Sequence, residues 1–188
     1  MVTGGAGYIG SHTCVELLNA GYDVVILDNL YNSSKKAVDR IEEITGKKVT
    51  FYENDMLDKE ALEKIFTAES IDAVIHFAGL KAVGESVAKP LEYYKNNITG
   101  ALTLVEVMRE HNCKNIIFSS SATVYGDPAF IPITEECPKG TPTNPYGWTK
   151  SMLEQMLTDI HTSDNEWNVI LQLSVIEKPM TLCHRLFR

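Results

Sequence analysis

Short apolar runs alternate along the chain with longer segments in which apolar positions recur at helical spacing. The runs predict strands at residues 1–3, 23–28, 49–52, 73–77, 115–120 and 168–173. The helical segments are residues 9–20, 36–45, 59–67, 90–111 and 145–161. The runs are continuously apolar, as expected for strands that helices cover on both faces of a parallel sheet. The pattern therefore predicts an α/β fold with a doubly wound parallel sheet of Rossmann type.

Composition and charge narrow the possible partners. A chain of 188 residues is long enough for one domain with a substantial core. Its net charge of −8 argues against nucleic acid or an anionic membrane as the main partner. No apolar run approaches membrane-spanning length, and the N-terminus lacks a signal-peptide pattern. Cys14, Cys113, Cys137 and Cys183 are scattered without metal-site spacing, so we expect no metal and reduced thiols in a cytoplasmic protein.

The first apolar run ends in a glycine-rich turn. Gly4, Gly7 and Gly10 recur at every third position between that run and the first predicted helix. A sharp strand-to-helix turn needs residues without a Cβ, and it leaves backbone N–H groups and the positive end of the helix dipole for a ligand. Such an end favours an anion, usually a pyrophosphate. Alone, the turn could equally be an ordinary tight loop; the elements that follow it favour a nucleotide site.

Polar residues follow the next predicted strands. Asp28 ends the second strand, near the spacing expected for a carboxylate that binds the adenosine ribose hydroxyls; a cap or turn role is the alternative. Asp55 could accept a hydrogen bond from an adenine amino group, with Met56 packing on the ring, or Asp55 could cap the next helix. Lys81 is a candidate phosphate-binding residue, although most lone lysines are simply solvated.

The fifth predicted strand leads into Ser119, Ser120 and Ser121, a type of run that is more often turn chemistry than catalysis. Beyond it, Tyr146 and Lys150 stand four residues apart, so their side chains share one helix face. A neighbouring ammonium would lower the pKa of the phenol and make Tyr146 a base for a sugar or alcohol hydroxyl at neutral pH. Tyr-x-x-x-Lys is common by chance; here it follows the glycine turn, the ribose acid and the serine-bearing strand in the required order.

Together these motifs resemble the extended short-chain dehydrogenase/reductase family, and within it the nucleotide-sugar 4-epimerases. The family's Gly-x-x-Gly-x-x-Gly turn and its Tyr-x-x-x-Lys pair are both present, and its catalytic serine or threonine falls on Ser121. The stretches 76–86 and 119–126 resemble the epimerases specifically. The similarity runs over residues 2–171.

The resemblance implies a tightly held NAD at the carboxyl ends of the strands. The residues that would line it come from the glycine turn, the strand ends and two helices. They are Gly4, Gly7, Tyr8, Ile9, Gly10, Asp28, Asn29, Leu30, Tyr31, Asn32, Ser33, Asp55, Met56, Phe77, Ala78, Gly79, Leu80, Lys81, Asn96, Tyr146 and Lys150.

The resemblance also implies a reaction, the interconversion of UDP-galactose and UDP-glucose through transient oxidation at hexose carbon 4. Tyr146 would take the proton of the 4-hydroxyl while the hydride passes to NAD. Lys150 would hold the nicotinamide ribose and keep the tyrosine ionised, and Ser121 would bind the reacting oxygen. The related 4,6-dehydratases carry an Asp-Glu pair where this chain has Ala122 and Thr123, so dehydration is disfavoured.

The resemblance ends near residue 171, which divides the chain into an expected NAD-binding domain at 1–171 and a divergent tail at 172–188. The first strand is short, and the second lobe that grips the uridine diphosphate in the family is missing from the sequence. We therefore expect this form to be weakly active or inactive. The alternative is a non-catalytic NAD-binding or interaction module.

Two further expectations concern binding. Because Asp28 stands where the 2′-phosphate of NADP would lie, we expect NAD in preference to NADP. The helical segments 90–111 and 145–161 carry more apolar residues than one face needs, which with the resemblance predicts a homodimer. These apolar residues are Leu91, Ile98, Leu102, Val105, Val107, Met108, Met152, Leu153, Met156 and Leu157.

Overall fold

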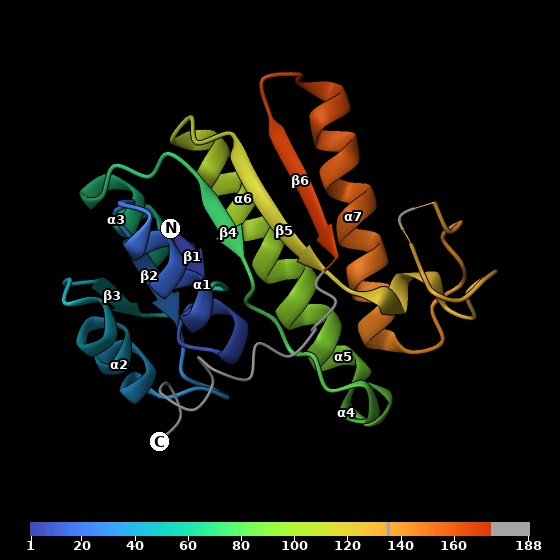
Figure 1. Cartoon of the computed structure of the whole chain (residues 1–188). Helices are drawn as coiled ribbons and strands as arrows, with labels where there is room; N and C mark the ends of the chain where they lie inside the picture. Colours follow the sequence, from blue (N-terminus) through green and yellow to red (C-terminus); the bar gives the residue numbers. More distant parts are fainter. Residues whose placement is uncertain (135, 174–188) are drawn as a thin grey trace.

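The computed structural model describes residues 1–134 and 136–173, which form one parallel sheet between two layers of helices (Figure 1). The strands are β1 (Val2–Thr3), β2 (Val25–Asp28), β3 (Thr50–Glu53), β4 (Val74–His76), β5 (Asn115–Ser120) and β6 (Asn168–Leu173). Their order is β3-β2-β1-β4-β5-β6, and every neighbouring pair is parallel. The strand order reverses beside β1, and ligands of such sheets bind at this switch point. The predicted fold class is confirmed.

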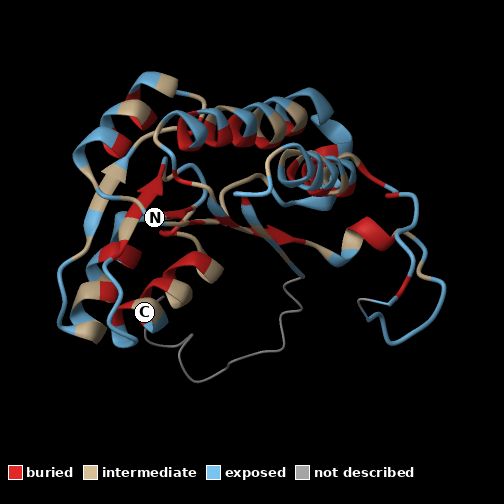
Figure 2. Ribbon diagram, turned by 90° about the horizontal axis from the view of Figure 1, so that it is seen from above, coloured by how far each residue is buried: buried red, intermediate tan, exposed pale blue. Residues whose placement is uncertain are grey.

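The helices connect successive strands. They are α1 (Tyr8–Asn19), α2 (Lys35–Thr45), α3 (Lys59–Ala68), α4 (Val83–Ala88), α5 (Pro90–Tyr93), α6 (Gly100–Glu110) and α7 (Pro145–Ser163), with a π-helical segment η1 (Tyr94–Thr99) and a 3-10 turn η2 (Ala122–Tyr125). Helices α1 and α2 pack together on one face of the sheet, and α3, α6 and α7 lie on the other (Figure 2).

Two apolar cores correspond to these two faces. Val15 of α1 and Ile41 of α2 pack with Ile26 of the sheet, and all three are almost fully buried. On the other face, the larger core joins Leu104 of α6 and Leu153 of α7. Burial of such side chains stabilises each face by roughly 1.5–3 kcal/mol per residue, and so it fixes the helices that end at the cavity.

The region after β4 differs from the sequence prediction of one helix at 90–111. The structure has α5, η1 and α6 there, preceded by α4, which the pattern did not predict. In η1 the wider π-helical turn buries Asn97. Its polar residues carry no apolar periodicity, which explains why no sequence pattern indicated the change. Such turns are frequent at functional sites.

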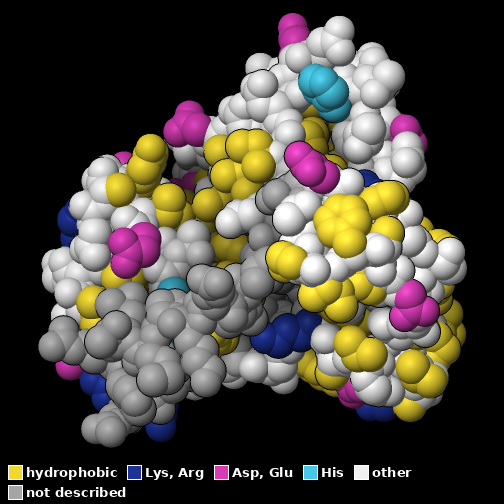
Figure 3. Space-filling model, turned by 45° about the vertical axis from the view of Figure 1, so that its right-hand side comes forward, with side chains coloured by type: hydrophobic (Ala, Val, Ile, Leu, Met, Phe, Trp, Pro, Cys, Tyr) yellow, Lys and Arg dark blue, Asp and Glu magenta, His cyan; other side chains and the backbone are white. Residues whose placement is uncertain are grey.

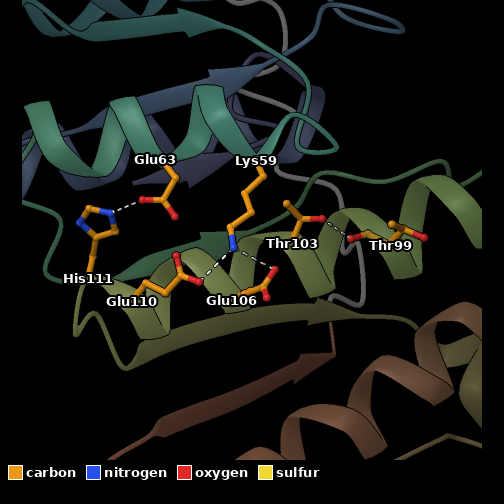
Figure 4. Close-up of polar contacts among 7 residues, drawn as sticks. All are labelled: Lys59, Glu63, Thr99, Thr103, Glu106, Glu110 and His111. Atoms are coloured by element: carbon orange, nitrogen blue, oxygen red, sulfur yellow. Dashed lines mark hydrogen bonds and ion pairs between the residues drawn. The ribbon is translucent and has the colours of Figure 1, made fainter.

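A polar cluster joins α3 to α6 (Figure 4). Lys59 Nζ lies 2.9 Å from Glu110 Oε1 and 3.3 Å from Glu106 Oε2. Beside it, His111 Nε2 lies 2.6 Å from Glu63 Oε2. Lys59, Glu106 and Glu110 are half exposed, so each of these two ion pairs contributes at most about 1 kcal/mol. The cluster orients the two helices, whereas the apolar core supplies most of their binding energy.

The apolar residues of the predicted dimer interface divide into three groups. Ile98 and Met156 are half-buried against the larger core. Val105, Val107, Met108, Leu153 and Leu157 are buried within the chain's own core, so these five are not available to a partner. Leu91, Leu102 and Met152 are 76%, 48% and 46% exposed. Other exposed apolar side chains come from α4, α7 and the loop 127–143, and hydrophobic groups gather on the right-hand part of the surface in Figure 3.

Strand β6 crosses the predicted domain boundary at residue 171, and residues 174–188 of the predicted tail lie outside the described residues. Val169 and Leu171 pack on the larger core beside α7. Because side chains alternate along a strand, Ile170 points to the opposite face, where it is 55% exposed. No helix of the described ranges covers β6 on that face (Figure 2).

Candidate functional site

A cavity of about 510 Å³ opens at the carboxyl ends of β1, β2, β4 and β5. Most of the predicted cofactor-binding residues line it together with the predicted catalytic ones. They are Gly4, Gly7, Tyr8, Ile9, Gly10, Asp28, Asn29, Tyr31, Asn32, Asp55, Met56, Phe77, Ala78, Gly79, Leu80, Lys81, Asn96, Ser121, Tyr146 and Lys150. The structure thus brings residues from both halves of the sequence into one site.

The glycine turn lines the cavity beside the N-terminus of α1. Gly4 has φ +69°, and a Cβ on Gly10 would lie 2.3 Å from the Gly4 carbonyl oxygen, closer than any real contact. The turn therefore requires glycine at both positions. No side chain caps the N-terminus of α1, and its first turn holds no acidic residue. This helix end borders the cavity, and its dipole favours an anion there.

Asp28 organises the loop after β2. Its Oδ2 accepts a 3.0 Å hydrogen bond from Ala6 N, and its Oδ1 accepts from Leu30 N at 2.9 Å and Ser33 Oγ at 2.8 Å. The turn role proposed as an alternative is therefore present, while Asp28 also lines the cavity. A carboxylate has about four lone-pair sites, so Oδ2 can still accept from a ligand hydroxyl. Leu30 and Ser33, which were predicted to line the NAD, are not among the residues that line the cavity, and both instead hydrogen-bond to Asp28.

Asp55 braces the loop after β3. Its Oδ2 accepts a hydrogen bond from Asn29 Nδ2 at 2.9 Å, and its Oδ1 accepts from Leu57 N at 2.9 Å. The residue that caps α3 is Asp58, whose carboxylate accepts from Ala61 N, so the capping alternative for Asp55 is wrong. The bond to Asn29 links two loops at the cavity's edge.

Asn97 fixes the loop after β4 through hydrogen bonds of its side-chain amide. Its Oδ1 accepts a hydrogen bond from Leu80 N at 2.8 Å, and its Nδ2 donates to Leu80 O at 2.9 Å and Thr149 Oγ1 at 3.1 Å. This buried amide pairs with Leu80 as a neighbouring strand would, and it ties the loop to α7. As a result Asn96, next to it, faces the cavity.

Sequence reasoning missed several cavity-lining residues: Leu27, Asn54, Leu57, Glu92, Lys95, Ser119 and Ser120. Most of them directly adjoin residues that were predicted at the same strand ends. Glu92 lies four residues before Asn96 on the same helical segment, a spacing that could have indicated a shared face. Lys95 and Lys81 are exposed cations at the rim.

Tyr146, Ser121 and Lys150 converge at the end of β5. Lys150 is almost fully buried, and its Nζ donates a 2.7 Å hydrogen bond to the Ser119 carbonyl oxygen. The same ammonium lies 4.6 Å from the centre of the Phe118 ring and 5.9 Å from that of Tyr146. Ser121 Oγ accepts a 3.0 Å hydrogen bond from Thr123 Oγ1. The Tyr146 phenol, the Ser121 hydroxyl and the Lys150 ammonium thus line the same part of the cavity wall.

The electrostatics of this triad differ from the sequence expectation. Burial raises the pKa of Tyr146, and a hydrogen bond with Ser121 opposes that rise. The expected lowering by Lys150 is wrong for this structure, because the ammonium is directed at Ser119 rather than at the phenol oxygen. Burial also lowers the pKa of Lys150 to about 8, partly offset by Glu154.

Ser120 provides a test of whether a polar ligand fits. It is 4% exposed, lines the cavity, and its Oγ makes no hydrogen bond within the described ranges. A buried hydroxyl without a partner costs roughly 1–3 kcal/mol, which a ligand hydroxyl or amide would recover. Together with the uncapped end of α1 and the Asp28 carboxylate, it matches a ligand with a pyrophosphate and ribose hydroxyls.

The described part of the chain contains no group of His, Cys, Asp or Glu side chains that could hold a metal ion. Cys14, Cys113 and Cys137 are buried free thiols, and burial raises the pKa of Cys14 to about 12. Cys183 lies outside the described residues. Among the described helices, none is long and apolar enough to span a membrane.

The fold and the site define a Rossmann-type protein with the Tyr-Lys-Ser arrangement of the short-chain dehydrogenase/reductases. A family model described as GDP-mannose 4,6 dehydratase matches residues 1–184, and the chain belongs to this family.

Curated relatives that are similar to this chain include UDP-glucose 4-epimerases. The UDP-glucose 4-epimerase of Bacillus subtilis is 66% identical over 171 residues, which are 91% of this chain and 50% of the relative. The mouse UDP-glucose 4-epimerase is 53% identical over 177 residues, 91% of this chain and 51% of the relative. The chain thus spans about half the length of the curated relatives it matches.

Solved structures of UDP-glucose 4-epimerases are similar to the fold of this chain. The UDP-glucose 4-epimerase from Bifidobacterium longum, solved in complex with NAD+ and UDP, superposes with a TM-score of 0.89 at 58% identity, over 90% of this chain and 51% of that one. The enzyme from Brucella ovis in complex with NAD gives a TM-score of 0.82 at 39% identity, over 92% and 50% of the two chains.

Proposed function

We propose that the cavity binds NAD and that this chain is the NAD-binding half of a UDP-hexose 4-epimerase. The observation that carries the proposal is the meeting, in one cavity, of the uncapped α1 terminus, Asp28 and the Tyr146–Lys150 pair. Support comes from the B. longum and B. ovis neighbours, whose structures hold NAD. When bound, NAD would accept a hydride from hexose carbon 4 and return it to the other face.

The chain's own residues would handle the proton. Tyr146 accepts it from the 4-hydroxyl, and Ser121 donates a hydrogen bond to the reacting oxygen. Because burial raises the pKa of Tyr146, the phenolate needs the Lys150 ammonium as a nearby positive charge. Lys150 is buried beside Tyr146, and charges interact more strongly there than in open water.

The substrate class, a UDP-hexose, is inferred from the relatives named above. Binding of the nucleotide end of a substrate orients its reacting end, and such orientation is worth roughly 7–11 kcal/mol. Tested by itself, a polypeptide that matches about half of each relative is therefore expected to turn over UDP-galactose far more slowly than the whole relatives do. The second candidate is a non-catalytic NAD-binding module, which would bind NAD in the same cavity without turnover.

A coupled assay tests this function. The purified chain with NAD and UDP-galactose is compared with its Tyr146→Phe variant and with the B. subtilis relative. We expect slow UDP-glucose formation that the variant abolishes. Turnover unaffected by the variant contradicts the role of Tyr146, and turnover within tenfold of the relative contradicts the expected low activity. NAD binding without any turnover, or without a rise in absorbance at 340 nm on adding sugar, favours the second candidate.

The cofactor proposal includes a preference for NAD over NADP. The Asp28 carboxylate lies at the cavity, and a 2′-phosphate placed against it would meet a like charge. Parallel calorimetric titrations with the two dinucleotides measure the preference. Equal or tighter binding of NADP contradicts it.

Homodimer formation in the cytoplasm completes the proposal. The exposed Leu91, Leu102 and Met152 support an isologous contact through α5, α6 and α7. The buried free thiols are compatible with a reducing compartment. Light scattering at micromolar concentration, with Leu91→Glu as a matched disruption, tests association; a monomer in both samples contradicts it.

A further inference from the structure

Glu154 is a buried carboxylate one helical turn beyond Lys150 on α7. Only 3% of the residue is exposed. Within the described ranges its Oε2 makes no hydrogen bond, although Lys139 Nζ lies 2.5 Å away as an ion pair. A carboxylate at this depth is costly unless positive charge compensates it. Lys139 pairs with it directly, and Lys150 stands four residues earlier on α7, within one helical turn.

Among the described residues around Lys150, Glu154 is the anion that acts on its charge. Strand β5 presents the Ser119 carbonyl and the Phe118 ring. Strand β4 presents His76, whose pKa burial lowers to about 3, so this imidazole is neutral. Helix α7 itself presents Tyr146 and Glu154. The charge of Glu154 raises the pKa of Lys150 against the larger effect of burial.

Lys139 reaches Glu154 from the loop between η2 and α7. Its side chain is 56% exposed, whereas that of Glu154 is 4% exposed, so the pair runs from solvent to the interior. The loop is held against η2: a Cβ on Gly140 would lie 2.1 Å from the Tyr125 carbonyl oxygen. This close approach places Lys139 over α7.

We propose that Glu154 is a positioning residue, the internal counter-ion that keeps Lys150 an ammonium, and that Lys139 competes with Lys150 for its charge. The inference deepens the proposed function, in which Lys150 acts as a cation beside Tyr146. The plain alternative is that Lys139 and Glu154 only fasten the loop to α7. The two interpretations differ in the sign of the change that they predict for the pKa of Lys150 when each partner is removed.

The test is the titration of Lys150 in the dinucleotide-free chain by NMR of ¹³Cε-labelled lysine, with the signal assigned by its loss in Lys150→Met. Glu154→Gln should lower the pKa of Lys150 by about one unit, because an opposite charge is lost. Lys139→Met should raise it, because the carboxylate then has one cation instead of two. Asp159→Asn removes an exposed charge from the same helix and should leave it unchanged.

No shift in Glu154→Gln, or shifts of the same sign in both variants, overturns the inference in favour of a simple fastening. Because the readout needs no NAD, failure of NAD binding would contradict the proposed function without obscuring this result. If NAD binds, Glu154→Gln should also lose affinity at a lower pH than the unmodified chain. Circular dichroism of each variant confirms that the fold is retained.

Discussion

Lys150 Nζ donates a 2.7 Å hydrogen bond to the carbonyl oxygen of Ser119, which fixes the ammonium at the end of β5 inside the protein. Burial there lowers the pKa of Lys150 from 10.5 to about 8. The folded chain therefore releases this proton at a lower pH than the unfolded chain. Its contribution to stability is present above about pH 10.5 and is lost as the pH falls through about 8.

Lys150→Met should remove this dependence. In the unmodified chain, this group increases the unfolding free energy by up to about 1.4 kcal/mol for each pH unit between 8 and 10.5. Urea unfolding at pH 7.5 and pH 10 gives the difference between variant and unmodified chain, which cancels groups common to both. A difference that does not change with pH contradicts the lowered pKa.

His76 should make the fold sensitive to acid. Its Nδ1 lies 2.7 Å from Thr3 Oγ1, and burial lowers its pKa from 6.5 to about 3. Stability is thus lost as the pH falls below 6.5, by up to about 1.4 kcal/mol per unit from this group. His76→Asn should be less stable at neutral pH but lose less between pH 7 and pH 5. An equal loss in both proteins would show that His76 does not titrate there.

Gly10→Ala should damage the cavity. The added Cβ would meet the Gly4 carbonyl 2.3 Å away, so the turn must shift at a cost of at least about 1–3 kcal/mol. Gly84→Ala is the matched control, because nothing lies within 4 Å of its Cβ and alanine suits a helix. Thermal unfolding should rank the control at or above the unmodified chain and Gly10→Ala well below it. Equal melting temperatures for both variants would show that the turn tolerates a Cβ.

Asn97→Ala should loosen the loop after β4. It removes both hydrogen bonds to Leu80 and the one to Thr149, leaving buried groups unpaired at about 1–3 kcal/mol each. Asn97→Asp keeps the acceptor for Leu80 N but loses the donors, so its effect should be intermediate. Hydrogen exchange of the Leu80 amide follows the change directly. Unchanged exchange in Asn97→Ala would contradict this role.

Apolar periodicity was sufficient to predict the sheet and its main helices, because these strands and helices pack apolar side chains against one of the two cores. The spans predicted for β5 and β6 agree with the structure, and α1 and α3 shift by one residue at their ends. Helix α4 and the π-helical turn were missed because polar contacts, such as those of Asn97, determine them. Apolar periodicity does not depend on polar contacts, so it cannot predict the elements that such contacts determine.

Motif spacing and the family resemblance together predicted most of the residues that line the cavity, since glycine turns and strand-end acids have strict geometric requirements. Motif spacing does not indicate the direction in which a side chain points. Spacing placed Lys150 on the same helix face as Tyr146. It did not show that the Lys150 ammonium points toward the Ser119 carbonyl oxygen. Likewise, the resemblance included Ser33 among the residues that would line NAD, whereas its side chain hydrogen-bonds back to Asp28. Both outcomes depend on tertiary packing.

Isothermal titration of the chain with NAD tests the central claim, that the cavity is a dinucleotide site. We expect one NAD per chain with a dissociation constant in the micromolar range or below, and a clear loss of affinity in Ser120→Ala, which removes the unpaired buried hydroxyl. The melting temperature should rise with NAD concentration as mass action requires. Absence of binding heat together with a melting temperature unchanged at millimolar NAD would contradict the account.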